Sequence, residues 1–143
     1  MYPFSKFFIA IIFILLAMQL QAQSVVGRWK TIDDETKKPK SIVEIYEQNG
    51  KIYGKIIKLF RTPQEDQDPV CDKCTDFRKG KKIIGLNIIT DMQKDGDEYV
   101  DGKILDPKNG KIYNCKLWVE NGNLMVRGYV AFFFRTQTWV REP

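Results

Sequence analysis

Two cysteines three positions apart are the clearest candidate for chemistry in this chain of 143 residues. Cys71 and Cys74 could form a local disulfide, bind a metal ion with carboxylate help, or act as a redox pair. A zinc site needs four ligands, and a reactive thiol needs nearby positive charge, whereas Asp68, Asp72 and Asp76 surround this pair. We therefore expect a structural disulfide, with a thiol or metal site at Cys71 and Cys74 as the last of the alternatives.

The chain contains a third cysteine and no histidine. Cys115 lies inside a predicted strand, and we expect a buried thiol that packs as a small apolar group. Without histidine, Ser-His-Asp triads, Cys-His nucleophile pairs and histidine metal sites are excluded. We expect no catalytic residues, no metal and no cofactor, and hence a protein that is not an enzyme.

Ligand binding is the second kind of chemistry, and it depends on which side chains of the last strand face inward. If Arg135 and Gln137 face the interior, the guanidinium needs an acceptor, because an unpaired buried charge is costly. Glu44, Tyr46 or Tyr113 could accept, but the carboxylate of a fatty-acid-like ligand would serve better, since arginine binds carboxylates through two parallel hydrogen bonds.

The opposite facing gives a different interior. If Thr136, Thr138 and Val140 point inward, the interior is small and apolar, and any ligand is neutral or absent. Trp139 and Arg141 would then lie on an outer belt suited to a protein partner. We favour this second arrangement, because it keeps the charged side chains of the strand in water.

The aromatic run at 132–134 bears on the same question. Phe134 and its neighbours could line a ligand mouth or could pack in the core. Together with the first arrangement of the last strand, this gives Tyr113, Phe134 and Arg135 as candidate ligand-binding residues.

The elements that must position these residues are short strands between tight turns. Asn-Gly and Asp-Gly pairs recur at 49–50, 95–96, 109–110 and 121–122, and each supplies the positive φ values that two-residue hairpin turns need. The expected strands are 26–32, 41–48, 51–60, 83–91, 98–105, 111–120, 123–130 and 133–141. Eight antiparallel strands in this order favour an up-and-down β-barrel, because closure removes exposed edges.

The first and last strands of the predicted barrel each carry a tryptophan near an arginine. Gly27 and Trp29 open the first strand, and Arg141 ends the last. We expect the guanidinium of Arg141 to lie over the indole of Trp29 and close one end of the barrel. The connection at 61–80 is the exception to the tight turns, and we expect it to lack structure of its own, as functional or mobile loops do.

Residues 1–22 have the pattern of a secretory signal peptide. Lys6 precedes an apolar run over 7–20 that is too short to span a bilayer, and Ala22 offers a cleavage position. We expect one domain over 23–143, exported to the periplasm or outside the cell and not membrane-spanning after cleavage. The formal charge of +5 is scattered, so we expect no nucleic-acid partner.

Taken in order, several motifs resemble those of one family. They are Gly27-Arg28-Trp29, Asn49-Gly50-Lys51-Ile52-Tyr53-Gly54-Lys55-Ile56, Ile84-Gly85-Leu86, Asp106-Pro107, Gly110-Lys111-Ile112-Tyr113, Arg127-Gly128-Tyr129 and the segment 135–141. The chain resembles the exported bacterial proteins grouped as domain of unknown function 2147. The resemblance implies a small barrel of lipocalin-like character with no established activity. The wider lipocalin and fatty-acid-binding group closes one barrel end with the residues that match Trp29 and Arg141.

Three functions remain open. The first is a non-enzymatic exported barrel that binds a small amphiphile or another envelope component. The second is a filled barrel that presents the 61–80 loop to a protein partner as an interaction or structural module. The third is a thiol or metal site at Cys71 and Cys74. Eight strands enclose an interior that is either just filled or able to hold one small ligand.

Overall fold

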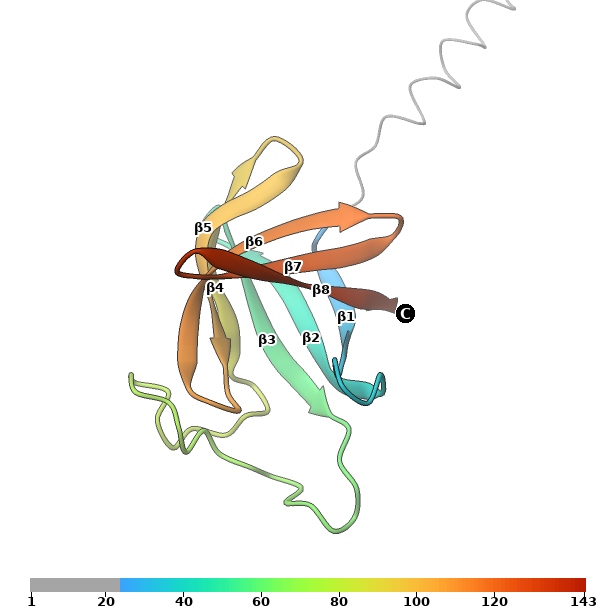
Figure 1. The fold of residues 1–143 in the computed structure, drawn as a ribbon, viewed down its shortest axis with the longest axis vertical. Helices are drawn as coiled ribbons and strands as arrows, with labels where there is room; N and C mark the ends of the chain where they lie inside the picture. The colour runs from blue at the N-terminus through green and yellow to red at the C-terminus, as the bar shows by residue number, and fades with distance from the viewer. Residues whose placement is uncertain (1–23) are drawn as a thin grey trace, which may run out of the picture.

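The computed structural model describes residues 24–143, which form a closed barrel of eight antiparallel strands (Figure 1). Each strand pairs with the next, and the last pairs with the first, which confirms the predicted up-and-down barrel. No helix within 24–143 is long and apolar enough to cross a membrane. The expected signal peptide, 1–22, lies outside the described residues. The strands are β1 (Gly27–Ile32), β2 (Pro39–Gln48), β3 (Lys51–Leu59), β4 (Asn87–Asp95), β5 (Glu98–Asp106), β6 (Lys111–Glu120), β7 (Asn123–Val130) and β8 (Phe133–Glu142).

Two of the four predicted hairpin turns have positive φ at both residues, whereas at 95–96 and 109–110 only the glycine does. Asn49 and Gly50 have φ values of 52° and 76°, and Asn121 and Gly122 have φ values of 51° and 78°. These left-handed conformations match the right-handed twist of the paired strands, which is why Asn-Gly fixes a two-residue turn. The turns therefore join consecutive strands as antiparallel neighbours through local backbone conformation.

The predicted position of the fourth strand, 83–91, is wrong by about four residues: β4 runs from Asn87 to Asp95. Gly85 has a φ of 92° and turns the chain, so Ile83 and Ile84 belong to the preceding loop despite their strand-like side chains. At the other end, Asp91 has a φ of 58°, and the register against β3 shifts there. This irregularity is a bulge, and it lets the strand continue past the position where the sequence suggested its end.

The core fills the end of the barrel where β1 begins. Inward-facing side chains from all parts of the sheet meet there and are nearly inaccessible to solvent. They include Trp29, Val43, Ile45, Ile52, Met92, Leu117, Leu124 and Trp139. We call this the closed end. At the opposite, open end lie the β1–β2 turn, the β3–β4 loop, the β5–β6 turn and the β7–β8 turn.

The β3–β4 loop, 60–86, is not without structure. It forms a small hairpin of its own, in which Val70 and Lys82 make an isolated bridge. It also covers the outer face of the barrel: Ile88 and Leu105 alternate with the inward Ile89 and Ile104, yet they are buried in one cluster with Cys71 and Cys74 of the loop. The loop thus packs beside the barrel (Figure 1), and the expectation of a structureless connection is wrong.

Candidate functional site

The last strand faces the interior with Arg135, Gln137 and Trp139. Trp139 pairs with the buried Leu124, and Gln137 pairs with the buried Val126. Directly opposed residues share one face of a sheet, so these β8 side chains lie on the inner face. Trp139 is 2% exposed, whereas Thr138 is exposed. The prediction that Thr136, Thr138 and Val140 face the interior is therefore wrong.

The physical reason lies in the position of the charges along β8. Burial of the large indole of Trp139 is worth more than burial of threonine methyl groups. The two arginines of the same face are at its ends, with Arg135 near the open end and Arg141 at the closed end, and both remain exposed. Charge therefore stays in water even though the strand turns this face inward.

A hydrogen-bonded chain of polar groups joins β8 to the β1–β2 turn. The indole N–H of Trp139 donates to Oε1 of Gln137 at 3.1 Å, and Nε2 of Gln137 donates to Oδ2 of Asp34 at 3.0 Å. The guanidinium of Arg135 donates to the same Asp34 oxygen and pairs with it as a salt bridge. Asp34 is the acceptor that Arg135 needs, and it is not one of the acceptors expected from the sequence.

Glu44, Tyr46 and Tyr113, the expected acceptors, do not take that role. Glu44 pairs with Arg28 and Lys55 on the outer face. Tyr46 donates to Oδ1 of Asn87 at 2.7 Å. The hydroxyl of Tyr113 accepts a hydrogen bond from Nδ2 of Asn109 at 3.3 Å. No short-range pattern links Asp34 with Arg135, since 101 positions separate them.

The inner face changes character toward the open end. Ile104 and Tyr113 are directly opposed on β5 and β6 and share the inner face with the buried Cys115, yet they are only half-buried. Gly128, which is opposite Arg135, has no side chain to fill the space, and a Cβ there would lie 3.7 Å from the Cβ of Tyr113. Inward-facing side chains at this end are therefore partly accessible to solvent, unlike those of the closed end. We call the set Asp34, Ile104, Tyr113, Gly128, Arg135 and Gln137 the barrel mouth.

Of the candidate ligand-binding residues, Tyr113 and Arg135 lie on the inner face and Phe134 does not. Phe134 points outward, where its ring centroid is 6.1 Å from that of Tyr129. The guanidinium of Arg127 lies 4.1 Å from the Phe134 ring centroid. Phe134 therefore belongs to the outer surface of the β7–β8 hairpin.

At the closed end, Arg141 stacks on Trp29 as predicted from the sequence. The guanidinium carbon of Arg141 lies 4.0 Å from the ring centroid of Trp29. The indole N–H of Trp29 donates to the carbonyl of Val25 at 2.8 Å. A Cβ on Gly27 would lie 2.8 Å from Nη1 of Arg141, so this glycine makes room for the guanidinium.

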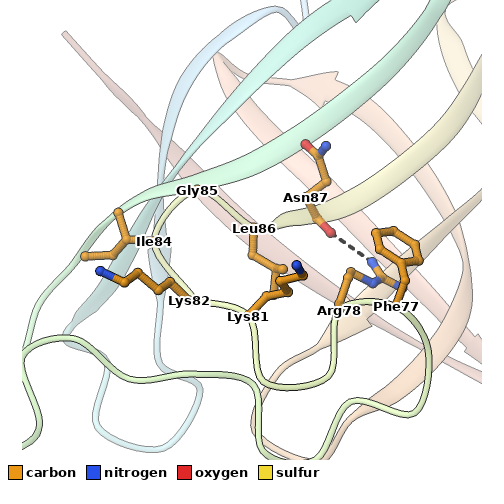
Figure 2. A pocket seen from close by; sticks show the side chains of 8 residues that line it. All are labelled: Phe77, Arg78, Lys81, Lys82, Ile84, Gly85, Leu86 and Asn87. Atoms are coloured by element: carbon orange, nitrogen blue, oxygen red, sulfur yellow. Dashed lines mark hydrogen bonds between the residues drawn. The ribbon is translucent and has the colours of Figure 1, made fainter.

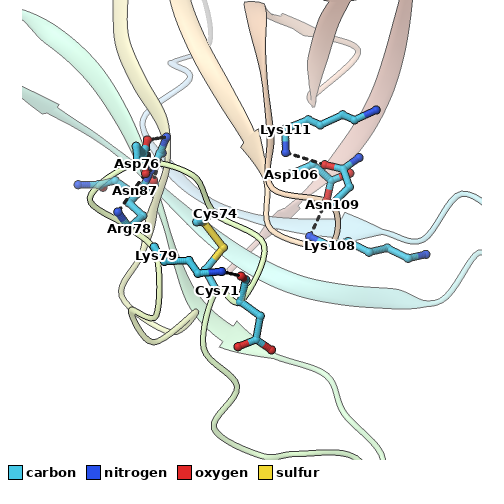
Figure 3. The surroundings of a disulfide bond; sticks show 11 residues. Cys71, Cys74, Asp76, Arg78, Lys79, Asn87, Asp106, Lys108, Asn109 and Lys111 are labelled. Atoms are coloured by element: carbon cyan, nitrogen blue, oxygen red, sulfur yellow. Dashed lines mark hydrogen bonds and ion pairs between the residues drawn. A yellow bond between two sulfur atoms is a disulfide. The ribbon is translucent and has the colours of Figure 1, made fainter.

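Cys71 and Cys74 are joined in a disulfide (Figure 3), as expected. Their sulfurs are bonded to each other, and residues 24–143 contain no cluster of three or more side chains suited to hold a metal ion. Cys115 is buried, and that burial raises the pKa of its thiol to about 12. The thiol thus packs as an apolar group.

A hollow of about 350 Å³ lies on the outer surface between the β3–β4 loop and the start of β4 (Figure 2). Arg78 lines it, but this side chain is already engaged: it donates to the carbonyl of Asn87 at 2.8 Å and pairs with Asp76 at 2.7 Å. Lys82 pairs with Asp68. These cations anchor the loop, and we therefore place the candidate site at the barrel mouth.

Comparison with known proteins places the barrel in a family. A family described as "Uncharacterized protein conserved in bacteria (DUF2147)" matches residues 27–141. Among solved structures, the chain is similar to protein HP1028 of Helicobacter pylori, described as belonging to the lipocalin family, with 21% identity, 84% of each chain covered and a TM-score of 0.71. At this identity the likeness shows a shared fold. No curated protein matches the chain. Because the family match spans nearly the whole barrel, from the first strand to the last, the chain belongs to the DUF2147 family of uncharacterised bacterial proteins.

Proposed function

We propose that this protein is an exported, non-enzymatic barrel that binds a small amphiphile with an anionic head group. One observation carries the proposal: an arginine stands on the inner face of the barrel, at an end where the other inward side chains are still accessible. An apolar interior with a few convergent polar groups is the usual form of a small-molecule site. The head group would bind at Arg135, and the tail would lie against Ile104 and Tyr113.

The depth of the site follows from burial. Beyond the barrel mouth, Trp139, Leu117 and Leu124 are at most 2% exposed and fill the closed end. A ligand tail therefore extends only through the open half of the barrel. This favours one short or folded apolar chain over a large ligand.

Asp34 occupies the place of the ligand head group when the site is free. Its carboxylate binds both Arg135 and Gln137, as a ligand carboxylate would. The Arg135 side chain is 69% exposed and that of Asp34 36%, so this ion pair is a surface pair. Such pairs are worth roughly 0–1 kcal/mol, and a ligand carboxylate can displace Asp34 at little cost.

Titration with cis-parinaric acid, an anionic fluorescent fatty acid, tests the proposal. Arg135→Ala should weaken binding by roughly tenfold or more, because a hydrogen bond to a charged group is worth about 1.5–3 kcal/mol. The methyl ester of the same probe should bind the parent protein as weakly as the acid binds Arg135→Ala. Thr138→Ala, on the outer face of the same strand, is the matched control and should bind as the parent does. Saturable binding that survives in Arg135→Ala would refute the site.

A second substitution should act in the opposite direction. Asp34→Asn removes the competing carboxylate but keeps the size of the side chain, so affinity for the acid should rise by up to about fivefold. General damage to the barrel would lower affinity in both variants. Opposite signs for Asp34→Asn and Arg135→Ala therefore separate competition at the head group from misfolding.

A protein-interaction module is the alternative function, and one observation supports it. The disulfide closes a short turn within the β3–β4 loop, and Phe77 on this loop is 80% exposed. If the barrel binds neither the fatty acid nor its ester, and Phe77→Ser abolishes capture of an envelope protein, this alternative replaces ligand binding.

Export is part of the proposal and has its own test. The sequence of residues 1–22 supports cleavage after Ala22. The intact mass of the protein recovered from the periplasm or the medium should lack 1–22. Full-length chain held stably in membranes would instead indicate an uncleaved anchor.

A further inference from the structure

The tip of the β7–β8 hairpin is the most exposed apolar surface among the described residues. Phe132 is 103% exposed, Phe133 66% and Phe134 55%, with Tyr129 and Val130 beside them. We call these five residues the aromatic tip. The turn between the strands has only two residues, Ala131 and Phe132, so the aromatic tip lies at the open end of the barrel, where β7 and β8 are joined.

The charged side chains of β7 and β8 that flank the aromatic tip are arginines, and one of them, Arg135, pairs with Asp34 of the β1–β2 turn. Between Glu120 and Glu142 the sequence contains three arginines and no Asp, Glu or Lys. One of these arginines, Arg127, lies over two rings, at 4.1 Å from the centroid of Phe134 and 4.8 Å from that of Trp118. An arginine laid along aromatic faces stays beside the apolar surface while it remains charged.

We propose that the aromatic tip docks on a membrane surface rich in anionic lipid. Aromatic side chains flanked by cations are the composition of segments that lie in the interface of a bilayer. The rings of Phe132 and Phe133 enter the acyl boundary, and Arg127 remains at the level of the lipid phosphates. Binding of this kind is weak and reversible, because few apolar side chains insert.

The shape of the tip favours a bilayer over a protein partner. A stable protein–protein interface uses roughly 20–30 residues on each side and needs a complementary surface. Five side chains on an exposed turn offer much less, whereas a fluid bilayer adapts to a convex shape. The proposal does not depend on ligand binding, but docking would set the barrel mouth, which shares this end, against the lipid.

Flotation with vesicles tests the docking. We expect the protein to bind vesicles of phosphatidylglycerol and phosphatidylethanolamine more strongly than vesicles of phosphatidylcholine, and less as salt is added. The double variant Phe132→Ser/Phe133→Ser should bind the anionic vesicles at least about tenfold less, because both inserting rings are lost. Phe77→Ser, which removes a ring that is 80% exposed from the β3–β4 loop, is the control and should bind as the parent does. All variants share one N-terminus, so any contribution from residues 1–23 cancels in the comparison.

A second measurement locates the inserted residue. Phe132→Trp should show quenching by brominated lipid beyond that of the parent, and Phe77→Trp should not. Equal vesicle binding by the tip variant and its control, no binding by the parent, or equal quenching at both sites would overturn the proposal. A dimer in solution that the double substitution dissociates would assign the tip to a second copy of the chain and would overturn it as well.

Discussion

Arg141 ties the last strand of the barrel to the first through Trp29. The two residues are directly opposed in the β1–β8 register, and the guanidinium carbon lies 4.0 Å from the indole centroid. The same guanidinium donates to the carbonyl of Val26 at 3.3 Å and to that of Ser24 at 3.0 Å. One side chain thus covers the buried indole and holds the segment that precedes β1.

Arg141→Ala should lower the free energy of unfolding by roughly 0.5–2 kcal/mol, the usual worth of a cation–π contact. Arg28→Ala is the control. Arg28 precedes Trp29 on β1, but it forms an exposed ion pair with Glu44, which is worth roughly 0–1 kcal/mol. Urea denaturation gives both values, and the emission of Trp29 should change only in Arg141→Ala. Equal losses with unchanged fluorescence would mean that the stacking contributes nothing.

Gly110→Ala should detach the β3–β4 loop. A Cβ at Gly110 would lie 1.8 Å from the carbonyl oxygen of Lys73, which is backbone and cannot move alone. Gly50→Ala is a close control, because Gly50 has nearly the same φ, 76° against 75°, and nothing within 4 Å of its Cβ. Gly50→Ala should cost about 1 kcal/mol from backbone strain, and Gly110→Ala distinctly more.

Limited proteolysis distinguishes local from global effects of Gly110→Ala. Cleavage within 60–86 should become faster in this variant and stay unchanged in Gly50→Ala. If both variants lose the same stability and show the same cleavage, the loop does not depend on its contact with the β5–β6 turn.

The three cysteines should divide into two classes when titrated with a thiol reagent. Folded protein should show no reactive thiol, because Cys71 and Cys74 are bonded and burial raises the pKa of the Cys115 thiol to about 12. Unfolding without reductant should release the thiol of Cys115 alone. Cys71→Ala/Cys74→Ala should lower stability by about 2 kcal/mol, as expected for a very short closed loop. A cooperative collapse of the barrel on reduction would contradict this account.

Asp76 should make the stability of the loop dependent on acid pH. Hydrogen bonds from Arg78 lower the pKa of Asp76 below its ordinary value of 3.8. Because the folded pKa is the lower one, the stabilisation is complete above the ordinary value and is lost as pH falls through the lowered pKa.

The measurement is the urea midpoint over a series of acid pH values. Asp76→Asn should have a lower midpoint at neutral pH and a flatter decline in acid than the parent. Asp97→Asn, at the exposed β4–β5 turn, should follow the parent curve. A parallel decline in the parent and Asp76→Asn would show that other groups cause the acid dependence.

The order of the strands and the closure of the barrel were predictable from the sequence. Asn49-Gly50 and Asn121-Gly122 impose their turns through backbone conformation, which is a local property. Hairpins in succession leave only the first and last strands to be joined, and Trp29 and Arg141 mark that junction. The disulfide was predictable for the same reason, since its two cysteines are close in sequence.

The facing of β8, the start of β4 and the partner of Arg135 were decided by the tertiary structure. In β8 both faces carry polar and apolar side chains, so the alternation pattern does not predict which face is inward. The inward face is the one that buries Trp139 beside Leu124. Ile83 is an apolar residue that is buried by the packing of the loop. From the sequence alone, such a loop residue cannot be told from a buried strand residue. Asp34 reaches Arg135 only because closure of the barrel brings the β1–β2 turn beside β8, and no local pattern in the chain records a contact that closure creates.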